Sequence, residues 1–391
     1  MHRSTRTEYF RTAGGRADRV TVVTAFEHPE RGTVHCPAAP LLTAWLEQRG
    51  VPCEPGPVIL RGGAEPAGRQ QGRPGLVATS YLDPTGGVVG LAAAAPARLV
   101  GAARRAVYGF TAVLRTRRVL LPEPLAACTA RPGGAAPGAA PRPRPAPADA
   151  PSAGWPAHPP VASPGAPPTA LCPAGTEARR IAEHRLAEGE TVLLIGSGTG
   201  AYGTGRAWPV LPGHPEELTV GTVEQAERVA PPTPERLAFV TVPCTPLQEV
   251  REIVAVLRRR FPTLRGQHPD QWCYRASDQR DTAESAARQS DLVLLLGHFG
   301  PTLPAWLPVG RTARPGGPGD LRPELLAEVS TVTVLEPAPG PPGGLGTAGL
   351  LTLLGGLGPL SVVDRRAVST VRRGHSGPPA AVQNPALSST S

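Results

Sequence analysis

The sequence contains no lysine, a single asparagine and only four isoleucines, so all 40 of its basic residues are arginine. Together with abundant alanine, glycine and proline, this bias is typical of a GC-rich genome. The net charge of +9 therefore reflects codon usage more than a binding partner. Aromatic residues make up only 4% of the chain, so the stacking platforms of single-strand binders are scarce. These deficits argue against nucleic acid as a partner.

Long apolar runs are also missing. No window approaches the roughly 18 apolar residues of a membrane span, and Met1 to Phe10 lack the apolar core of a signal peptide. We therefore expect a cytoplasmic protein with no membrane partner. The six cysteines form no CxxC pair, which excludes zinc-ribbon and thioredoxin patterns. Structural disulfides are not expected in a reducing compartment.

Proline is concentrated in one segment, where it supplies 13 of the 40 residues 131–170. Such a stretch lacks backbone donors and cannot bury a core, so it predicts an extended insertion. Docking of a proline motif on a partner is the alternative. We expect residues 128–170 to be a disordered insertion, residues 366–391 a disordered tail and residues 1–18 a loose N-terminus.

Short β-branched runs alternate with amphipathic segments along the rest of the chain. The runs predict strands at residues 19–25, 76–82, 87–92, 118–121, 191–196, 237–242, 291–297 and 331–335. The amphipathic segments predict helices at residues 37–50, 95–107, 176–188, 222–229, 246–261, 277–289 and 323–329, with a frayed helix at 344–358. Thr245, Pro246 and Gln248 fit a capping box at one of these helix starts. The alternation predicts an α/β fold with parallel sheets, whose sites lie beyond the carboxyl ends of the strands.

Cys36, Cys172 and Cys273 share one local setting, because each lies in a loop beside a predicted helix start. The helix dipole and the unpaired N–H groups at such a start favour a thiolate. Three such thiolates brought together would suit iron–sulfur ligation, and three ligands rather than four would leave one iron open to substrate. On the pattern alone, three ordinary buried cysteines remain the alternative.

The residues around two of these cysteines carry a series of motifs. They read Leu171-Cys172-Pro173, Ile195-Gly196-Ser197, Thr241-Val242-Pro243-Cys244-Thr245, Arg260-Phe261-Pro262 and Trp272-Cys273-Tyr274. In this order they resemble the T-C-P, I-G-H, T-Q-T-T-L, R-F-P and D-I-C-Y motifs of the 4-hydroxy-3-methylbut-2-enyl diphosphate reductase (LytB) family. The resemblance is good over residues 172–297 and fair over 19–50, where Glu30 to Cys36 is similar to the family's P-R-G-F-C.

The resemblance implies three small α/β lobes with mostly parallel sheets around a pseudo-threefold axis. At the centre, Cys36, Cys172 and Cys273 would hold a [4Fe-4S] cluster. Residues 19–36 would be the first strand and loop, packing with the third lobe, and the lobes would span residues 37–127, 171–268 and 269–365. The implied activity is the bacterial, cytoplasmic reductive dehydroxylation of an allylic diphosphate in isoprenoid biosynthesis. Its partners would be a small-molecule diphosphate and an external electron donor such as ferredoxin or flavodoxin.

The chain departs from the family's pattern at the acid/base and diphosphate-binding positions. The H-A-G-H-P-E segment reads Ser197 to Tyr202, and the S-x-N-S-S-N segment reads His298 to Leu303. Tyr202 stands where the family has its proton-delivering Glu, and Thr302, Arg206 and Arg275 are candidates for substrate binding, since a guanidinium suits phosphate. A packed tyrosine and solvated arginines are the alternative.

Three interpretations follow. The chain is a divergent reductase, or a non-catalytic iron–sulfur or accessory protein of the same fold, or a decayed paralogue. A competing motif, G-x-G-x-x-A at residues 196–201, is a dinucleotide fingerprint, which requires a helix next. Residues 202–215 instead carry three prolines and no apolar period, which argues against nucleotide binding.

Overall fold

The computed structural model describes residues 5–12, 18–60, 74–83, 86–123, 173–196, 211, 214–297, 299, 303–336 and 344–367. These residues form two compact units. The larger unit contains the described residues up to 123 and those from 275 onward, and the smaller unit contains the described residues 173–274. Within the described ranges, no helix combines the length and the apolar character that crossing a membrane requires.

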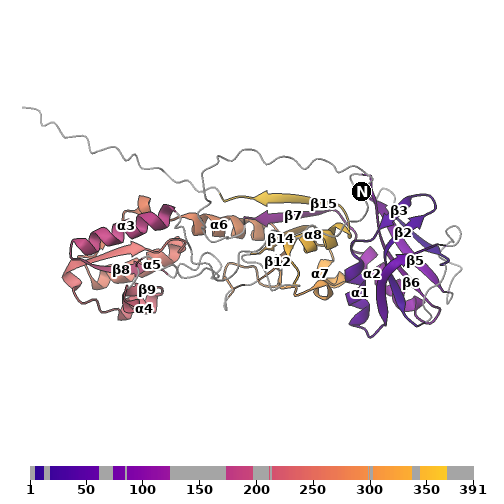
Figure 1. The fold of residues 1–391 in the computed structure, drawn as a ribbon, viewed down its shortest axis with the longest axis horizontal. Helices are drawn as coiled ribbons and strands as arrows, with labels where there is room; N and C mark the ends of the chain where they lie inside the picture. Colours follow the sequence, from indigo (N-terminus) through magenta and orange to yellow (C-terminus); the bar gives the residue numbers. More distant parts are fainter. Residues whose placement is uncertain are drawn as a thin grey trace, which may run out of the picture. The chain divides into compact units, whose positions relative to one another are not determined.

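The first sheet of the larger unit is mixed, with strand order β1-β5-β6-β3-β2-β4 (Figure 1). The pairs β2–β4 and β3–β6 are parallel, and the other pairs are antiparallel. Helices α1 and α2 pack on it through one apolar core. The bounds are β1 Arg6–Phe10, β2 Val20–His28, β3 Gly32–His35, α1 Ala39–Glu47, β4 Cys53–Val58, β5 Gly75–Leu82, β6 Val88–Ala95 and α2 Val100–Thr111.

The expectation of a loose N-terminus is wrong for residues 6–10. Tyr9 and Phe10 are buried, and their strand β1 runs antiparallel to β5. Burial of two aromatic side chains offsets the entropy of ordering this short segment. Strands β2 and β3 pair within the first sheet. Val20 and Val22 of β2 also share one core cluster with Leu294, a residue of the expected third lobe.

The second sheet of the larger unit is entirely parallel, with order β13-β12-β14-β7-β15. Strand β7, which we expected in the first lobe, lies between β14 and β15 and pairs in parallel with both. One core cluster contains Leu46 and Val107, from the helices that pack on the first sheet, together with Leu294 and Leu354 from the region of the second sheet. The bounds are β7 Arg117–Pro122, α6 Arg275–Arg288, β12 Leu292–Leu295, β13 Thr312–Ala313, η5 Pro318–Asp320, α7 Pro323–Leu326, β14 Thr331–Leu335, α8 Thr347–Gly355 and β15 Leu360–Arg365.

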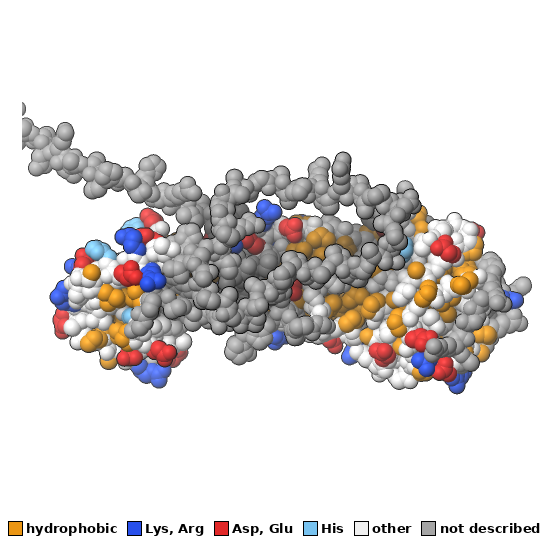
Figure 2. Space-filling view, in the orientation of Figure 1, with side chains coloured by type: hydrophobic (Ala, Val, Ile, Leu, Met, Phe, Trp, Pro, Cys, Tyr) orange, Lys and Arg blue, Asp and Glu red, His pale blue; other side chains and the backbone are white. Residues whose placement is uncertain are grey.

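The smaller unit is a four-stranded parallel sheet with order β11-β10-β8-β9. Alternate residues of β8 point to opposite faces, so Val192 packs with helix α3 and Leu193 with helix α5. On the face in Figure 2, arginine and acidic side chains of this unit are interspersed. The bounds are α3 Pro173–Ala187, β8 Thr191–Ile195, η2 Glu216–Leu218, β9 Thr219–Val220, α4 Val223–Arg228, η3 Pro234–Arg236, β10 Leu237–Thr241, α5 Leu247–Arg260, β11 Arg265–Gly266 and η4 Pro269–Gln271.

The predicted α/β class with mostly parallel sheets is confirmed. One predicted helix start is wrong, because α5 begins at Leu247 with Pro246 at its N-cap and has no side-chain cap. Thr245 is instead buried in the loop before the helix. The expected insertion at 128–170 lies outside the described residues, as does the tail from residue 368.

Candidate functional site

The three predicted ligand cysteines all stand directly before helices. Cys36 follows strand β3 and comes three residues before α1. Cys273 comes two residues before α6. Cys172 itself lies outside the described residues, and helix α3 begins at the next residue, Pro173. The helix starts expected from the sequence are therefore present at all three positions.

Cys36 lies deep in the larger unit. Its side chain is only 3% exposed and packs in an apolar cluster with Phe26 and Val34. Its N–H donates to the Thr24 carbonyl over 2.9 Å, and its carbonyl accepts from Ala39 N over 3.0 Å. Burial raises the pKa of the Cys36 thiol to about 12. The surroundings therefore hold a neutral thiol, and a thiolate here requires a bound cation to balance its charge.

Cys273 ends a loop that hydrogen bonds tie to the smaller sheet. The Oε1 atom of buried Gln267 accepts from Thr241 N over 3.0 Å and from Thr241 Oγ1 over 2.8 Å. Its Nε2 atom donates to the Gln271 carbonyl over 3.0 Å. Trp272 Nε1 donates back to the Gln267 carbonyl over 3.2 Å. This amide network joins the half-buried Cys273 loop to the carboxyl end of β10.

Gly196, in the I-G motif, is required for packing. Its φ is +110°, and an added Cβ would lie 2.1 Å from Thr245 Oγ1. Its N–H donates to the Val220 carbonyl over 2.9 Å. No larger residue fits between β8 and the loop that precedes α5. This packing accounts for the first glycine of the competing dinucleotide motif without a nucleotide.

Arg275 is the one described member of the substrate-binding candidates. It opens helix α6, and its Nη2 atom lies 2.9 Å from Glu123 Oε1. Binding a diphosphate would require the guanidinium to exchange this carboxylate for the ligand. Tyr202, Arg206 and Thr302 lie outside the described residues.

In the part of the chain that the structure describes, no three His, Cys, Asp or Glu side chains are grouped as a metal site. Cys36 and Cys273 belong to different units, so their convergence stays a prediction. The donor chemistry nevertheless fits, because soft thiols are the ligands that iron–sulfur clusters take. Cys36 is surrounded by apolar side chains, where a thiolate would need iron to balance its charge.

Two further residues near the Cys273 loop, Cys244 and Gln267, were not predicted as site residues. Cys244 has a left-handed backbone with φ +62°, which is uncommon for a residue other than glycine, and it lies three residues before α5. Its position after a parallel strand and before a helix was a readable signal. Gln267 gave no signal, because its burial depends on the fold of the 267–272 loop.

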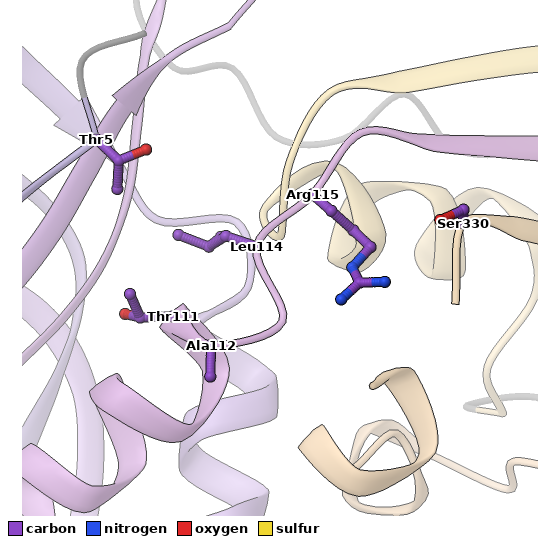
Figure 3. Close-up of a pocket in the computed structure, with 6 residues that line it drawn as sticks. All are labelled: Thr5, Thr111, Ala112, Leu114, Arg115 and Ser330. Atoms are coloured by element: carbon purple, nitrogen blue, oxygen red, sulfur yellow. The ribbon is translucent and has the colours of Figure 1, made fainter. Parts of the chain in front are cut away.

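A cleft of about 390 Å³ opens in the larger unit (Figure 3). None of the sequence-predicted site residues lines it. It lies beside the end of α2, where the negative end of the helix dipole disfavours an anion, although Arg115 is present. The cleft is therefore a poor diphosphate site. Its lining residues are Thr5, Thr111, Ala112, Leu114, Arg115 and Ser330.

Fold and local geometry define an α/β protein with mostly parallel sheets and cysteines placed before helices. A family model described as LytB protein matches residues 168–300. A 4-hydroxy-3-methylbut-2-enyl diphosphate reductase of Ruegeria pomeroyi is 32% identical over 128 residues, which are 33% of this chain and 40% of that protein. The 4-hydroxy-3-methylbut-2-enyl diphosphate reductase 2 of Mycobacterium bovis is 31% identical over 213 residues, which are 52% of this chain and 63% of that protein.

Among solved structures, the E-1-hydroxy-2-methyl-but-2-enyl-4-diphosphate reductase of Plasmodium falciparum aligns with a TM-score of 0.36 and 16% identity. The alignment covers 52% of this chain and 65% of that one. The chain thus matches between two fifths and two thirds of the length of these relatives. Over these parts of its length the chain is similar to the LytB proteins, and the resemblance drawn from the motifs is confirmed.

Proposed function

We propose that the protein holds a [4Fe-4S] cluster through Cys36, Cys172 and Cys273 and acts as an oxidoreductase on a small-molecule diphosphate. The observation that carries this proposal is the position of the three cysteines. Each precedes a helix, and the three helices pack against three different sheets. A helix start favours a thiolate through its dipole and its free N–H groups. At Cys36, where burial raises the pKa of the thiol to about 12, the iron would also have to balance the charge.

The proposed substrate class comes from the relatives, whose names describe reduction of an allylic diphosphate. When bound, the cluster would pass on two electrons, one at a time, for cleavage of the allylic C–O bond. One proton would leave with the hydroxyl as water, and the other would be added to the allyl carbon. An external donor such as ferredoxin or flavodoxin would return the electrons. We place the activity in isoprenoid biosynthesis in the bacterial cytoplasm.

The chain's own residues would bind the substrate and deliver the proton. Tyr202 replaces the family's glutamate, and its phenol is a weaker acid, so proton delivery would be slow. Arg206 and Arg275 would bind the diphosphate as bidentate donors, with Thr302 adding a hydroxyl. For Arg275, part of the binding free energy would go into displacing Glu123.

The test is anaerobic reconstitution of the full chain with iron and sulfide. We expect a broad visible absorption band and bound iron in the wild type, both lost in Cys172→Ser. Cys53→Ser is the matched control, because Cys53 lies within strand β4 and its Sγ donates to the Thr43 carbonyl. Iron uptake that survives Cys172→Ser would contradict the proposed ligand set. Turnover of the allylic diphosphate with a chemical reductant then tests the activity.

A second candidate, an iron–sulfur protein without turnover, is favoured by Cys244. It is a fourth cysteine before a helix, and it follows β10, the strand to which Gln267 ties the Cys273 loop. A fourth thiolate would close the iron position that a substrate needs. If this candidate is correct, the allylic diphosphate changes the electron paramagnetic resonance spectrum of Cys244→Ser but not that of the wild type. A wild-type response would favour the reductase.

A further inference from the structure

The loop that carries Cys36 is packed against a glycine-rich turn from the far end of the chain. This turn, residues 355–358, begins at the last residue of helix α8. A Cβ added to Gly356 would lie 2.5 Å from the backbone nitrogen of Ala38 and 2.7 Å from its Cβ. The backbone φ of Gly356 is −71°, so an alanine there would be excluded by contact alone and not by backbone strain. The turn therefore touches the chain two residues from the Cys36 thiol.

A phenol holds this turn in place. Tyr81, at 6% exposure in strand β5, donates its hydroxyl proton to the Gly355 carbonyl over 2.7 Å. The same oxygen accepts from Gly358 N over 3.0 Å. One side chain thus connects both ends of the turn.

A fully buried arginine holds the middle of the turn. Arg117 Nη1 donates to the Leu357 carbonyl over 3.1 Å, and Nη2 donates to the Val113 carbonyl over 2.6 Å. Arg117 has no carboxylate partner among the described residues, so its charge is balanced by carbonyl oxygens alone. The backbone N–H of Arg115 donates to the same Leu357 carbonyl over 3.2 Å. A buried charge without a counter-ion is costly to keep, which indicates a positional role.

We propose that Tyr81, Arg117 and Gly356 form a bracket that positions Cys36 as a cluster ligand. This inference rests on the proposed function. The bracket presses the turn onto Ala38, while the hydrogen bonds of Cys36 to Thr24 and Ala39 hold the other side of the loop. A ligand that is fixed before the metal arrives needs no reorganisation, and residues behind the ligands commonly set metal affinity and potential. Tyr81, Arg117 and Gly356 are therefore positioning residues.

The first test uses the apo protein and needs no cluster. The rate at which iodoacetamide alkylates Cys36 reports how often its loop opens, because the thiol is buried. We expect Gly356→Ala to raise that rate about tenfold, which corresponds to about 1.4 kcal/mol of lost local stability. Cys53, in the same sheet, is the internal reference and keeps its rate. Gly317→Ala is the matched control, since an added Cβ there meets nothing within 4 Å.

The second test uses the reconstituted protein. We expect the midpoint potential and the electron paramagnetic resonance spectrum to shift in Gly356→Ala and to stay at wild-type values in Gly317→Ala. Tyr81→Phe, which keeps the ring and removes the two hydrogen bonds, should speed Cys36 alkylation in the same direction. If Gly356→Ala does not fold, Tyr81→Phe replaces it in both tests.

Each outcome separates the bracket from the proposed function. Unchanged Cys36 alkylation in folded Gly356→Ala and in Tyr81→Phe would overturn the bracket. Faster alkylation with an unchanged potential and spectrum would reduce it to a stabilising contact and overturn its positioning role. A wild type that takes up no iron would overturn the proposed function, and alkylation would then still decide whether the bracket orders Cys36.

Discussion

The two described cysteine loops are held by different forces. The Cys36 loop lies in an apolar cluster and is wedged by the 355–358 turn, so close packing and a buried cation hold it. The Cys273 loop is half-buried and is fixed to β10 by the amide of Gln267. A packed contact is disrupted when a side chain changes in volume, whereas a hydrogen-bond network is disrupted when a donor or an acceptor is removed. The two loops should therefore respond to different substitutions.

The largest expected effect, loss of the cluster, is the same for a substitution in either loop. If both cysteines bind the same cluster, Cys36→Ser and Cys273→Ser should each reduce reconstituted iron to background, since a serine hydroxyl is a poor substitute for a soft thiolate. Iron and sulfide per chain are the measurements, with Cys53→Ser as the control. Full iron binding in either variant would remove that cysteine from the ligand set.

The next effect acts on the packed loop alone. Arg117→Ala removes a fully buried side chain, deprives the Val113 carbonyl of its donor and leaves the Leu357 carbonyl with the Arg115 N–H alone. We expect a loss of about 3 kcal/mol in the unfolding free energy of the larger unit, from the cavity and the unpaired Val113 carbonyl. Urea denaturation measures it. Arg118→Ala is the matched control, because Arg118 is the exposed neighbour on the same strand.

If Arg117→Ala proved as stable as Arg118→Ala, the buried arginine would not hold the turn. Packing around a buried arginine would then not be what distinguishes the Cys36 loop from the Cys273 loop.

A smaller effect acts on the hydrogen-bonded loop. Gln267→Leu deprives Thr241 N–H and Oγ1 of their acceptor and should cost about 1–3 kcal/mol. Alkylation of Cys273 should accelerate while that of Cys36 stays constant. Gln248→Leu is the control, because Gln248 is exposed on α5. Equal acceleration at both cysteines would show that the two loops are coupled and not separately held.

The sequence predicted the parallel regions better than the mixed sheet. Strand 331–335 was located to the residue, because a buried parallel strand is a short run of apolar and β-branched residues. Strand β4, Cys53–Val58, was missed because its prolines and glycine resemble a loop and are tolerated there only at a sheet edge.

The candidate site shows the same limit. The helix starts after the cysteines were readable, since apolar periodicity is local. The bracket was not readable, because Tyr81, Arg117 and Gly356 meet only after three distant segments have folded. Thr245 was assigned to a cap because its pattern fits one, whereas packing against Gly196 determines its position.

The smallest expected effect is a pH dependence confined to the packed loop. Burial raises the pKa of the Cys36 thiol from 9.0 to about 12 and that of Tyr81 from 10.0 to about 12. The folded state thus holds both protons more tightly than the unfolded state. Their stabilisation is complete below about pH 9 and is lost as pH rises toward 12. Arg117 acts in the opposite direction, since burial lowers its pKa to about 10.

Tyr81→Phe isolates one part of this dependence. The variant should be less stable at neutral pH, because two hydrogen bonds are lost, and its stability should fall less steeply between pH 10 and 12. We expect the slopes to differ by about 1 kcal/mol per pH unit, close to the value for one proton. Urea denaturation of the apo protein across this range measures both slopes, with Tyr108→Phe as the exposed control. Tyr81 lies in the larger unit and Cys273 in the smaller one. The alkylation rate of Cys273, corrected for the ionisation of its own thiol, should therefore not follow the pH dependence of stability that Tyr81 causes. If it did, high pH would be opening the whole molecule and not the loop that packing holds.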